Sequence, residues 1–292
     1  MSKRRRPPAT RSGPPREKVR DVFVPRPFHG LADEPDWVAL RELVPAATAP
    51  LRLAQDLVDK YGEREVTLAT VLPMAVPAMS RPDGRILLGI QRNTQSGDVS
   101  RDLAAALEAA LETEPGAAVA TPPLPGPGAR LQDVLADGAL DITMLDGFAF
   151  WLDGGDDDPM IRASLERADA SVFPTVHMAA ARAAYWCRLP GKAHVRWVLP
   201  DAEESALAAL SRLAAAGGLT LGEGTKFAGM FRAHGLLVPV WDLPTAPEAA
   251  DWEEPFGDFA ARYARALTVT GDLDSAERRA RQGLLGRQLT LR

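Results

Sequence analysis

The sequence has almost no cysteine. Its single cysteine, Cys187, excludes an intramolecular disulfide, and a zinc site built from several thiolates cannot form within the chain. A lone thiol is typical of proteins of the reducing cytosol. The simplest role for Cys187 is that of a small buried hydrophobic residue. A reactive pair with His194, expected opposite it on a hairpin, is the alternative.

Long hydrophobic runs are also absent. The charge-free stretch from Val66 to Ser80 contains Pro73 and Pro77 and is shorter than the about 20 apolar residues of a membrane-spanning helix. The basic N-terminus continues into proline, serine and arginine instead of the apolar core of a secretory signal. We therefore expect a cytoplasmic protein without membrane insertion.

Residues that bind metals and cofactors are few and poorly spaced. The four histidines show no i, i+4 pair and no H-E-x-x-H motif: His29, His177, His194 and His234. The acidic run 153–158 lacks the ligand pattern of an EF-hand and predicts a loop that caps a helix starting at Pro159. In GEGTKFAG at 222–229 the threonine precedes the lysine, unlike a phosphate-binding loop. The sequence predicts no metal and no cofactor.

Charge is divided unequally along the chain. The formal net charge is −5, but residues 1–20 carry eight basic residues and one glutamate, a local charge of +7, which leaves −12 for residues 21–292. We call residues 1–24 the basic arm. Its basic residues are Lys3, Arg4, Arg5, Arg6, Arg11, Arg16, Lys18 and Arg20.

The basic arm has no apolar periodicity and four prolines, so we expect it to be disordered. Such an arm can bind phosphates of ribosomal or other RNA or DNA, or an acidic protein, without reading sequence. A purely solubilising extension is the alternative. No aromatic residue is interleaved with the charges of residues 1–20, so base stacking is not expected there. The rest of the chain, which we call the body, is acidic; it would repel nucleic acid and is expected to bind a protein partner.

In the first part of the body, the sequence pattern predicts helices separated by hairpins. Short helices are expected from Asp33 to Pro45, burying Trp37, Leu40 and Val44, and at 51–61. A hairpin should follow at 66–79 and 85–91, turning at Arg81-Pro82-Asp83-Gly84, then a helix to 112 with leucines four residues apart. A second hairpin is expected at 141–145 and 148–152.

The second part repeats this order. Hairpins are expected at 184–189 with 194–199 and at 226–232 with 236–241, separated by a helix from Asp201 to Ala216. Asp201 and Glu204 form a capping-box pattern. Two helices follow, at 255–267 and 275–284.

These patterns predict an α+β fold with a duplicated ββαββ unit, mainly antiparallel sheets, helices on one face and a disordered basic arm. The alternative is an α+β chain with two hairpins per helix by coincidence. The predicted domains are the arm at 1–24, a first α+β half at 25–152, a second at 153–271, and a C-terminal helix and tail at 272–292.

The polar residues that most resemble a site gather around the last hairpin. Arg232 and His234 occupy a tight turn, Arg-Ala-His-Gly, where they could face an anion or take part in proton transfer. Glu223 and Asp242 are the other catalytic candidates, with Lys226 and Trp241 nearby. The alternative is a turn that needs Gly235 for its positive φ and carries ordinary surface charges.

Several segments are specific to one group of proteins: DWVALRELVPAATAPL (36–51), VTLATVLPMA (66–75), SGDVSRDLAAALE (96–108), AAYWC (183–187), RWVLP (196–200) and LGEGTKFAGMFRAHGLLVPVWDLP (221–244). Through them the chain resembles an uncharacterised actinobacterial family of unknown function. Longer members of this family begin with a SEC-C zinc motif, and some have been labelled SecA-like translocase or topoisomerase. The Cys-x-Cys and Cys-His ligands are absent here, so the resemblance implies no zinc and no mechanism for this chain.

The sequence favours a non-catalytic cytoplasmic binding or adaptor protein whose arm contacts ribosome or RNA. The alternative is an enzyme of unknown reaction at the Arg232/His234 hairpin or in the crevice between the halves. A deep pocket with convergent polar groups would favour the enzyme. A flat face with exposed aromatic residues would favour the binding protein. A DNA-binding regulator is disfavoured because no helix carries the basic stripe that major-groove entry requires.

Overall fold

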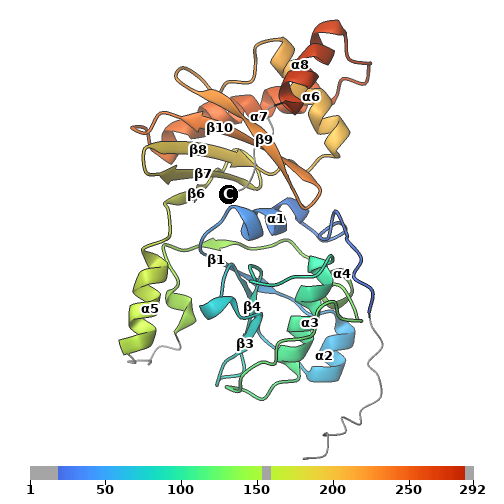
Figure 1. Ribbon diagram of the computed structural model, residues 1–292, viewed down its shortest axis with the longest axis vertical. Helices are drawn as coiled ribbons and strands as arrows, with labels where there is room; N and C mark the ends of the chain where they lie inside the picture. Colours follow the sequence, from blue (N-terminus) through green and yellow to red (C-terminus); the bar gives the residue numbers. More distant parts are fainter. Residues whose placement is uncertain (1–18, 153–158, 287–292) are drawn as a thin grey trace, which may run out of the picture.

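The fold consists of two five-stranded sheets with helices packed around them (Figure 1). The computed structural model describes residues 19–152 and 159–286. Most of the predicted arm, the acidic run 153–158 and the basic C-terminal end lie outside these residues. The predicted α+β class with mainly antiparallel sheets is confirmed.

The first sheet is mixed. Its strand order is β3-β4-β2-β1-β5, with β2 and β4 parallel and the other pairs antiparallel. The elements of this half are α1 (Glu34–Glu42), β1 (Ala47–Leu51), α2 (Gln55–Tyr61), β2 (Val66–Ala69), a 3-10 turn (Pro73–Ala75), β3 (Ala78–Ser80), β4 (Ile86–Gly89), α3 (Val99–Leu111), α4 (Leu131–Val134), β5 (Thr143–Met144) and a 3-10 turn (Ala149–Trp151).

The second sheet is antiparallel throughout, in the order β6-β7-β8-β10-β9. The elements of this half are α5 (Pro159–Asp169), β6 (Thr175–His177), β7 (Ala184–Leu189), β8 (Lys192–Trp197), α6 (Glu203–Ala215), β9 (Lys226–Ala233), β10 (Leu236–Leu243), a 3-10 turn (Ala249–Trp252), α7 (Glu253–Leu267) and α8 (Ser275–Leu285).

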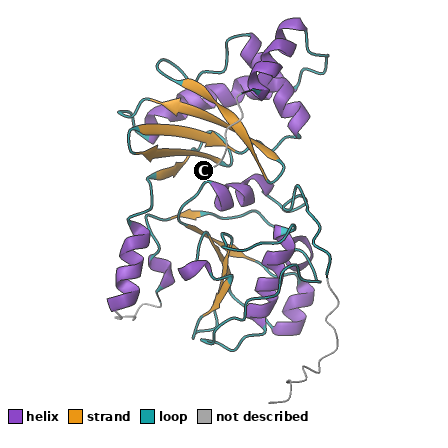
Figure 2. Cartoon of the chain, in the orientation of Figure 1, coloured by secondary structure: helices purple, strands orange, loops and turns teal. Residues whose placement is uncertain are grey.

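Both faces of the second sheet are buried. On β10, Leu237 and Trp241 point to the core that contains α6 and α7, whereas Leu236 and Val238 point to the core that contains α1. This alternation follows from the two-residue period of a strand. The sheet therefore lies between the α6–α8 layer and α1 of the first half (Figures 1 and 2).

Three hairpins form at the predicted turns, but the single strand predicted at 66–79 is wrong, because the 3-10 turn divides it into β2, which runs parallel to β4, and β3. β3 pairs with β4, β7 with β8, and β9 with β10, each antiparallel and each turning at a glycine with positive φ. The predicted leucines of α3 are buried on one face. These elements form where predicted because their turn chemistry and periodicity are local.

The second hairpin predicted for the first half is wrong. Only β5 forms there, and the segment after Gly147 makes a 3-10 turn instead of a strand. The backbone N–H of Phe148 donates to Asp169 Oδ1 at 2.7 Å, and the rings of Phe148 and Trp151 stack with centroids 4.8 Å apart. The segment after Gly147 is therefore held by aromatic packing and by a hydrogen bond to the Asp169 side chain, and not by pairing with a second strand.

The duplicated ββαββ unit does not hold in strand order. After α3 the chain returns as β5, which pairs with β1 at one edge, while β4 pairs with the earlier strand β2. After α6 the chain instead returns as the complete β9–β10 hairpin, and β10 pairs with β8. The repeated order of hairpins and helices along the sequence thus corresponds to two differently connected sheets.

One strand and one helix cap differ from the predictions. The predicted helix at 51–61 is shorter, and the strand β1, which was not predicted, precedes it and contains Pro50. Pro50 is tolerated because β5 pairs only with Ala47 and Thr48, so β1 is unpaired on that side at residue 50. At α6 the Asp201 side chain accepts from Tyr263 Oη at 2.8 Å and does not cap the helix.

The two predicted halves share a core. One continuous cluster of buried residues contains Trp37 and Leu40 of α1 together with Tyr185, Phe231 and Val238 of the second sheet. The boundary predicted near residue 152 therefore does not separate two independent cores.

Candidate functional site

The polar residues predicted to cluster at the last hairpin lie at two different ends of it. Arg232 and His234 lie at the turn end of β9, but Lys226 and Asp242 pair at the opposite end. Arg232 lies six positions along the strand from Lys226, which corresponds to about 20 Å at ~3.3 Å per residue. Glu223 lies in the exposed loop before β9. The four catalytic candidates therefore do not form one site.

Arg232 is bound by a carboxylate. Its Nη2 lies 2.6 Å from Oε1 of Glu203 at the start of α6, and its Nε donates to both carboxylate oxygens at 2.9 Å. These hydrogen bonds hold the pKa of Glu203 below its usual value and raise the pKa of Arg232. Glu203 therefore already neutralises the Arg232 guanidinium and occupies the position at which an anion would have to bind.

This ion pair should contribute little to stability, because both side chains are about one-third exposed. In a double-mutant cycle of Arg232→Ala and Glu203→Ala, we expect a coupling energy of about 0.5–1 kcal/mol. Urea denaturation of the four proteins measures it. A coupling energy of several kcal/mol would show that the pair is a structural anchor.

His234 joins the hairpin to the first half. It has a φ of 47°, and Gly235 follows at 82°, so both central residues of the turn have the positive φ of a type I′ turn. His234 Nε2 lies 2.7 Å from Glu42 Oε1, and its ring packs edge-on against Phe28. Burial would raise the pKa of Glu42, but the contacts with His234 and Arg41 outweigh it and lower the pKa.

A groove separates the hairpin turn from the end of the arm. Its volume is about 490 Å³, and its walls include Phe23, Val24, Pro25, Glu42, Val99, Glu203, Arg232 and His234. Phe23 is 76% exposed. The predicted hairpin residues therefore line a surface, with their charged groups already paired.

The last residues of the predicted arm are fixed to the body. Val24 N donates to Gly97 O at 2.8 Å, and Gly97 N donates to Asp21 Oδ1 at 2.7 Å. A Cβ at Gly97 would lie 2.7 Å from Val22 O, so only glycine permits this approach. Within the described residues, Arg20 is exposed just before this attachment. The predicted arm thus ends in a defined anchor.

Cys187 and His194 are neighbours across β7 and β8, as predicted. Burial raises the pKa of the Cys187 thiol, which opposes formation of a thiolate. His194 Nδ1 lies 3.0 Å from Asp242 Oδ1. This arrangement favours the structural role for the cysteine.

A second pocket lies between the halves, where the sequence analysis placed the alternative site, but its polar lining residues were not among the predicted candidates. We call it the interhalf pocket; its volume is about 350 Å³. Its polar lining comes from Asp36 of α1, His177 of β6, Arg182, and Tyr185 of β7. Leu140, Ile142 and Met144 form its apolar wall. The size is within the range of small-molecule sites.

Asp36 is the most perturbed carboxyl group of this pocket. It is 3% exposed, and burial raises its pKa to about 6, although a hydrogen bond from the Ala183 backbone partly opposes the shift. Ala183 has a φ of 55°, a strained value for a residue with a Cβ. The fold therefore uses strained backbone to direct an N–H group at a buried carboxylate.

Arg182 lies at the edge of the interhalf pocket and contacts two carboxylates. Its Nη1 donates to Asp33, and its Nε lies 3.3 Å from Asp36 Oδ2. The Arg182 side chain is 57% exposed. Asp33 is also held by Leu140 N, which donates to its Oδ2 at 3.0 Å.

Tyr185 is fully buried, and its hydroxyl has no hydrogen-bond partner among the described residues. Burial and the nearby charge of Asp36 raise its pKa, so the hydroxyl stays protonated. The His177 ring packs edge-on against Tyr185, with centroids 5.2 Å apart. Burial lowers the pKa of His177, which favours the neutral imidazole.

The comparison with known families gives a match over most of the chain. Residues 27–292 match a family of unknown function, DUF5926. The chain belongs to this family. No curated protein matches it, and no solved structure matches it.

The DUF5926 match includes the interhalf pocket, both sheets and most of the groove, whereas Phe23, Val24 and Pro25 of the groove and all eight basic residues of the arm lie before residue 27. Within the described parts of the chain, no three histidine, cysteine, aspartate or glutamate side chains are placed to hold a metal ion. None of the helices at 19–152 and 159–286 has the length and apolar content of a membrane span.

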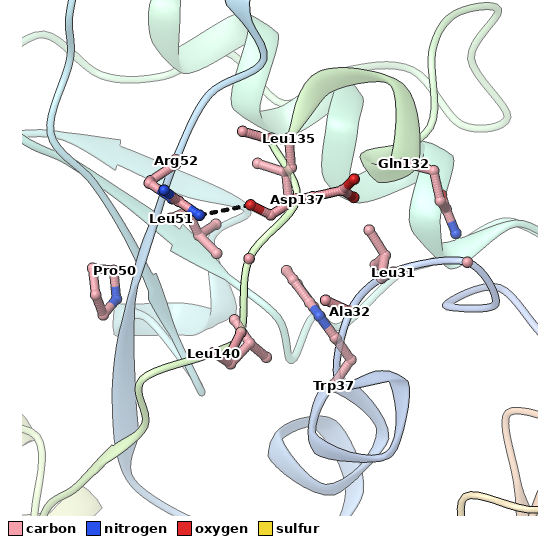
Figure 3. A pocket seen from close by; sticks show the side chains of 14 residues that line it. Leu31, Ala32, Trp37, Pro50, Leu51, Arg52, Gln132, Leu135, Asp137 and Leu140 are labelled. Carbon is pink, nitrogen blue, oxygen red and sulfur yellow. Dashed lines mark hydrogen bonds between the residues drawn. The ribbon is translucent and has the colours of Figure 1, made fainter.

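A smaller pocket of the DUF5926 domain lies wholly in the first half (Figure 3). Trp37, Leu135 and Leu140 border it, and Arg52 Nη2 donates to the Asp137 carbonyl at 2.6 Å. Its volume of about 50 Å³ is well below that of ligand sites. The interhalf pocket is therefore the better candidate site.

Proposed function

We propose that this protein is a cytoplasmic binding or adaptor protein whose basic arm contacts a polyanion, with ribosomal or other RNA as the first candidate. The observation that carries the proposal is the division of charge, +7 in residues 1–20 against −12 in the rest. A segment with this many lysines and arginines attracts the phosphates of a nucleic acid whatever its nucleotide sequence. The acidic body repels them, so the contact is confined to the arm.

The attachment of the arm supports this function. Because Asp21 and Val24 are held at Gly97, the basic segment leaves the body at one fixed place beside α3. The groove with exposed Phe23 lies next to this point and offers a surface for a protein partner of the body. A translation or translocation context fits the SEC-C motif of the longer relatives that the chain resembles.

Catalysis remains the second candidate, at the interhalf pocket instead of the hairpin. Arg232 and His234 are each already paired with a carboxylate. Asp36 and Tyr185 combine burial, shifted pKa values and a pocket, which is a pattern found at functional sites.

The arm is tested by RNA binding at varied salt. We expect the full chain to bind a short single-stranded RNA with a steep salt dependence, and Arg4→Gln, Arg5→Gln and Arg6→Gln together to reduce the slope of log K against log salt by about 2, at ~0.7 per lost phosphate contact. Fluorescence anisotropy measures both quantities.

The matched control removes the same charge from the body: Arg265→Gln, Arg278→Gln and Arg279→Gln, all exposed. We expect this variant to keep the slope of the parent protein. Equal weakening by the two variants, or no binding even at low salt, would contradict the proposal.

A further inference from the structure

Carboxylates outnumber cations among the described residues that line the interhalf pocket or contact its lining. Asp36 is the carboxylate that lines it, and two further carboxylates contact lining residues. Asp33 pairs with Arg182, and the oxygens of Glu253 accept the backbone N–H groups of Ala179 and Ala180. Arg182 is the only cation among the described residues that line the pocket, and it is shared between Asp33 and Asp36. The pocket therefore favours a cation and disfavours an anion.

The pocket also contains an unused hydrogen-bonding group. The Tyr185 hydroxyl is buried without a partner among the described residues, and a buried unpaired hydroxyl costs about 1–3 kcal/mol. A ligand with a polar hydrogen would satisfy it. The ring of His177, which is exposed and packs edge-on against Tyr185, also lines the pocket and offers π-electron density to an organic cation.

The opposite wall of the pocket is apolar. Ile142 and Met144 of the segment around β5 lie there. They suit the hydrocarbon part of an amphipathic ligand, and a thioether adapts to varied shapes. A hydrated metal ion would leave this wall unused, which favours an organic ligand.

We propose that the interhalf pocket binds a small organic ammonium, with its charged nitrogen beside Asp36, a hydrogen bond to the Tyr185 hydroxyl, and its apolar part against Ile142 and Met144. Arg182 bridges the two aspartates at the edge and holds Asp36 in place. The strained backbone of Ala183 serves the same purpose. This site is independent of the basic arm.

Three probes of similar size test the charge preference on the full chain: 2-phenylethylammonium, neutral 2-phenylethanol and anionic 3-phenylpropionate. We expect isothermal titration calorimetry to show saturable binding of the ammonium, with an affinity at least about tenfold higher than that of the alcohol, equivalent to about 1.4 kcal/mol. The carboxylate should not bind.

Two substitutions locate the site. Asp36→Asn preserves the side-chain shape and should weaken ammonium binding at least about tenfold, while binding of the alcohol changes little. Tyr185→Phe should weaken ammonium binding several-fold and should not reduce stability, because it removes an unpaired hydroxyl. Asp272→Asn, on an exposed loop, removes the same charge as a control.

Equal affinities for the ammonium and the alcohol would overturn the proposal. So would no saturation by the ammonium at millimolar concentration, or full retention of its binding in both variants of the pocket. If Asp36→Asn does not fold, Tyr185→Phe and the comparison of probes still decide the question.

Discussion

Replacing Phe28 with alanine is expected to lower the free energy of unfolding by about 3–5 kcal/mol, the range for truncation of a buried phenylalanine. Phe28 is fully buried, stacks on Trp37 with ring centroids 5.9 Å apart, and meets His234 edge-on at 5.4 Å. It thus touches both halves, and its loss leaves a cavity where they meet. Chemical denaturation followed by tryptophan fluorescence measures the effect.

We expect the unfolding of Phe28→Ala to remain one transition, because the core is continuous across the two halves. Phe173→Ala is the matched control: Phe173 is 44% exposed, and its truncation should change stability by less than about 0.5 kcal/mol. Two separated transitions in the parent protein would instead show that the halves unfold as independent domains.

Replacing Asp36 with asparagine is expected to stabilise the protein by about 2 kcal/mol at pH 8. The pKa of Asp36 is about 6 in the folded protein, against about 3.9 in an unfolded chain, which corresponds to about 3 kcal/mol of unfavourable ionisation. Asparagine keeps an acceptor for the Ala183 N–H but loses the contact with Arg182, which reduces the gain.

The gain should depend on pH in a defined direction. Because folding raises the pKa of Asp36, the folded state binds this proton more tightly, and the stability it provides is lost as pH rises through about 6. The advantage of asparagine should therefore shrink toward zero as the pH is lowered from 8 to about 4. Other titrating groups near Asp36, His177 among them, are common to both proteins and cancel in the difference.

Thermal denaturation of both proteins across this pH range measures the effect, with Asp272→Asn as the control. An Asp36→Asn protein that is less stable than its parent at pH 8 would show that Arg182 more than compensates the buried charge. The two expected results have one explanation: the carboxylate of Asp36 lowers the stability of the free protein, and it is retained because the ligand binds to it.

The local features of this protein were predictable. The turns at Gly84, Gly191 and Gly235 and the helix at 99–111 formed as expected, although the first hairpin uses only β3 of the strand predicted at 66–79. The strand β1 was missed because alanine and Pro50 give no strand signal, and β1 forms only through pairing with β2 and β5. The second hairpin of the first half was predicted wrongly because Asp169, from a later helix, takes its backbone donor.

The site was not predictable in the same way. Arg232, His234, Glu223 and Asp242 drew attention because they are polar and close in sequence, and two of them are now known to sit at the far end of the hairpin from the others. Asp36 looked like an ordinary acidic residue in the first turn of a helix. Tyr185 lay in an apolar strand.

The sequence by itself determined the α+β class, the hairpins and the division of charge between arm and body, because turns, periodicity and net charge depend on neighbouring residues. Only the tertiary structure decided that α1 covers the second sheet and that Asp36, Arg182 and Tyr185 share a pocket. Arg182 and its partner Asp33 are 149 positions apart, and burial, unlike sequence, makes a carboxylate or a hydroxyl chemically unusual.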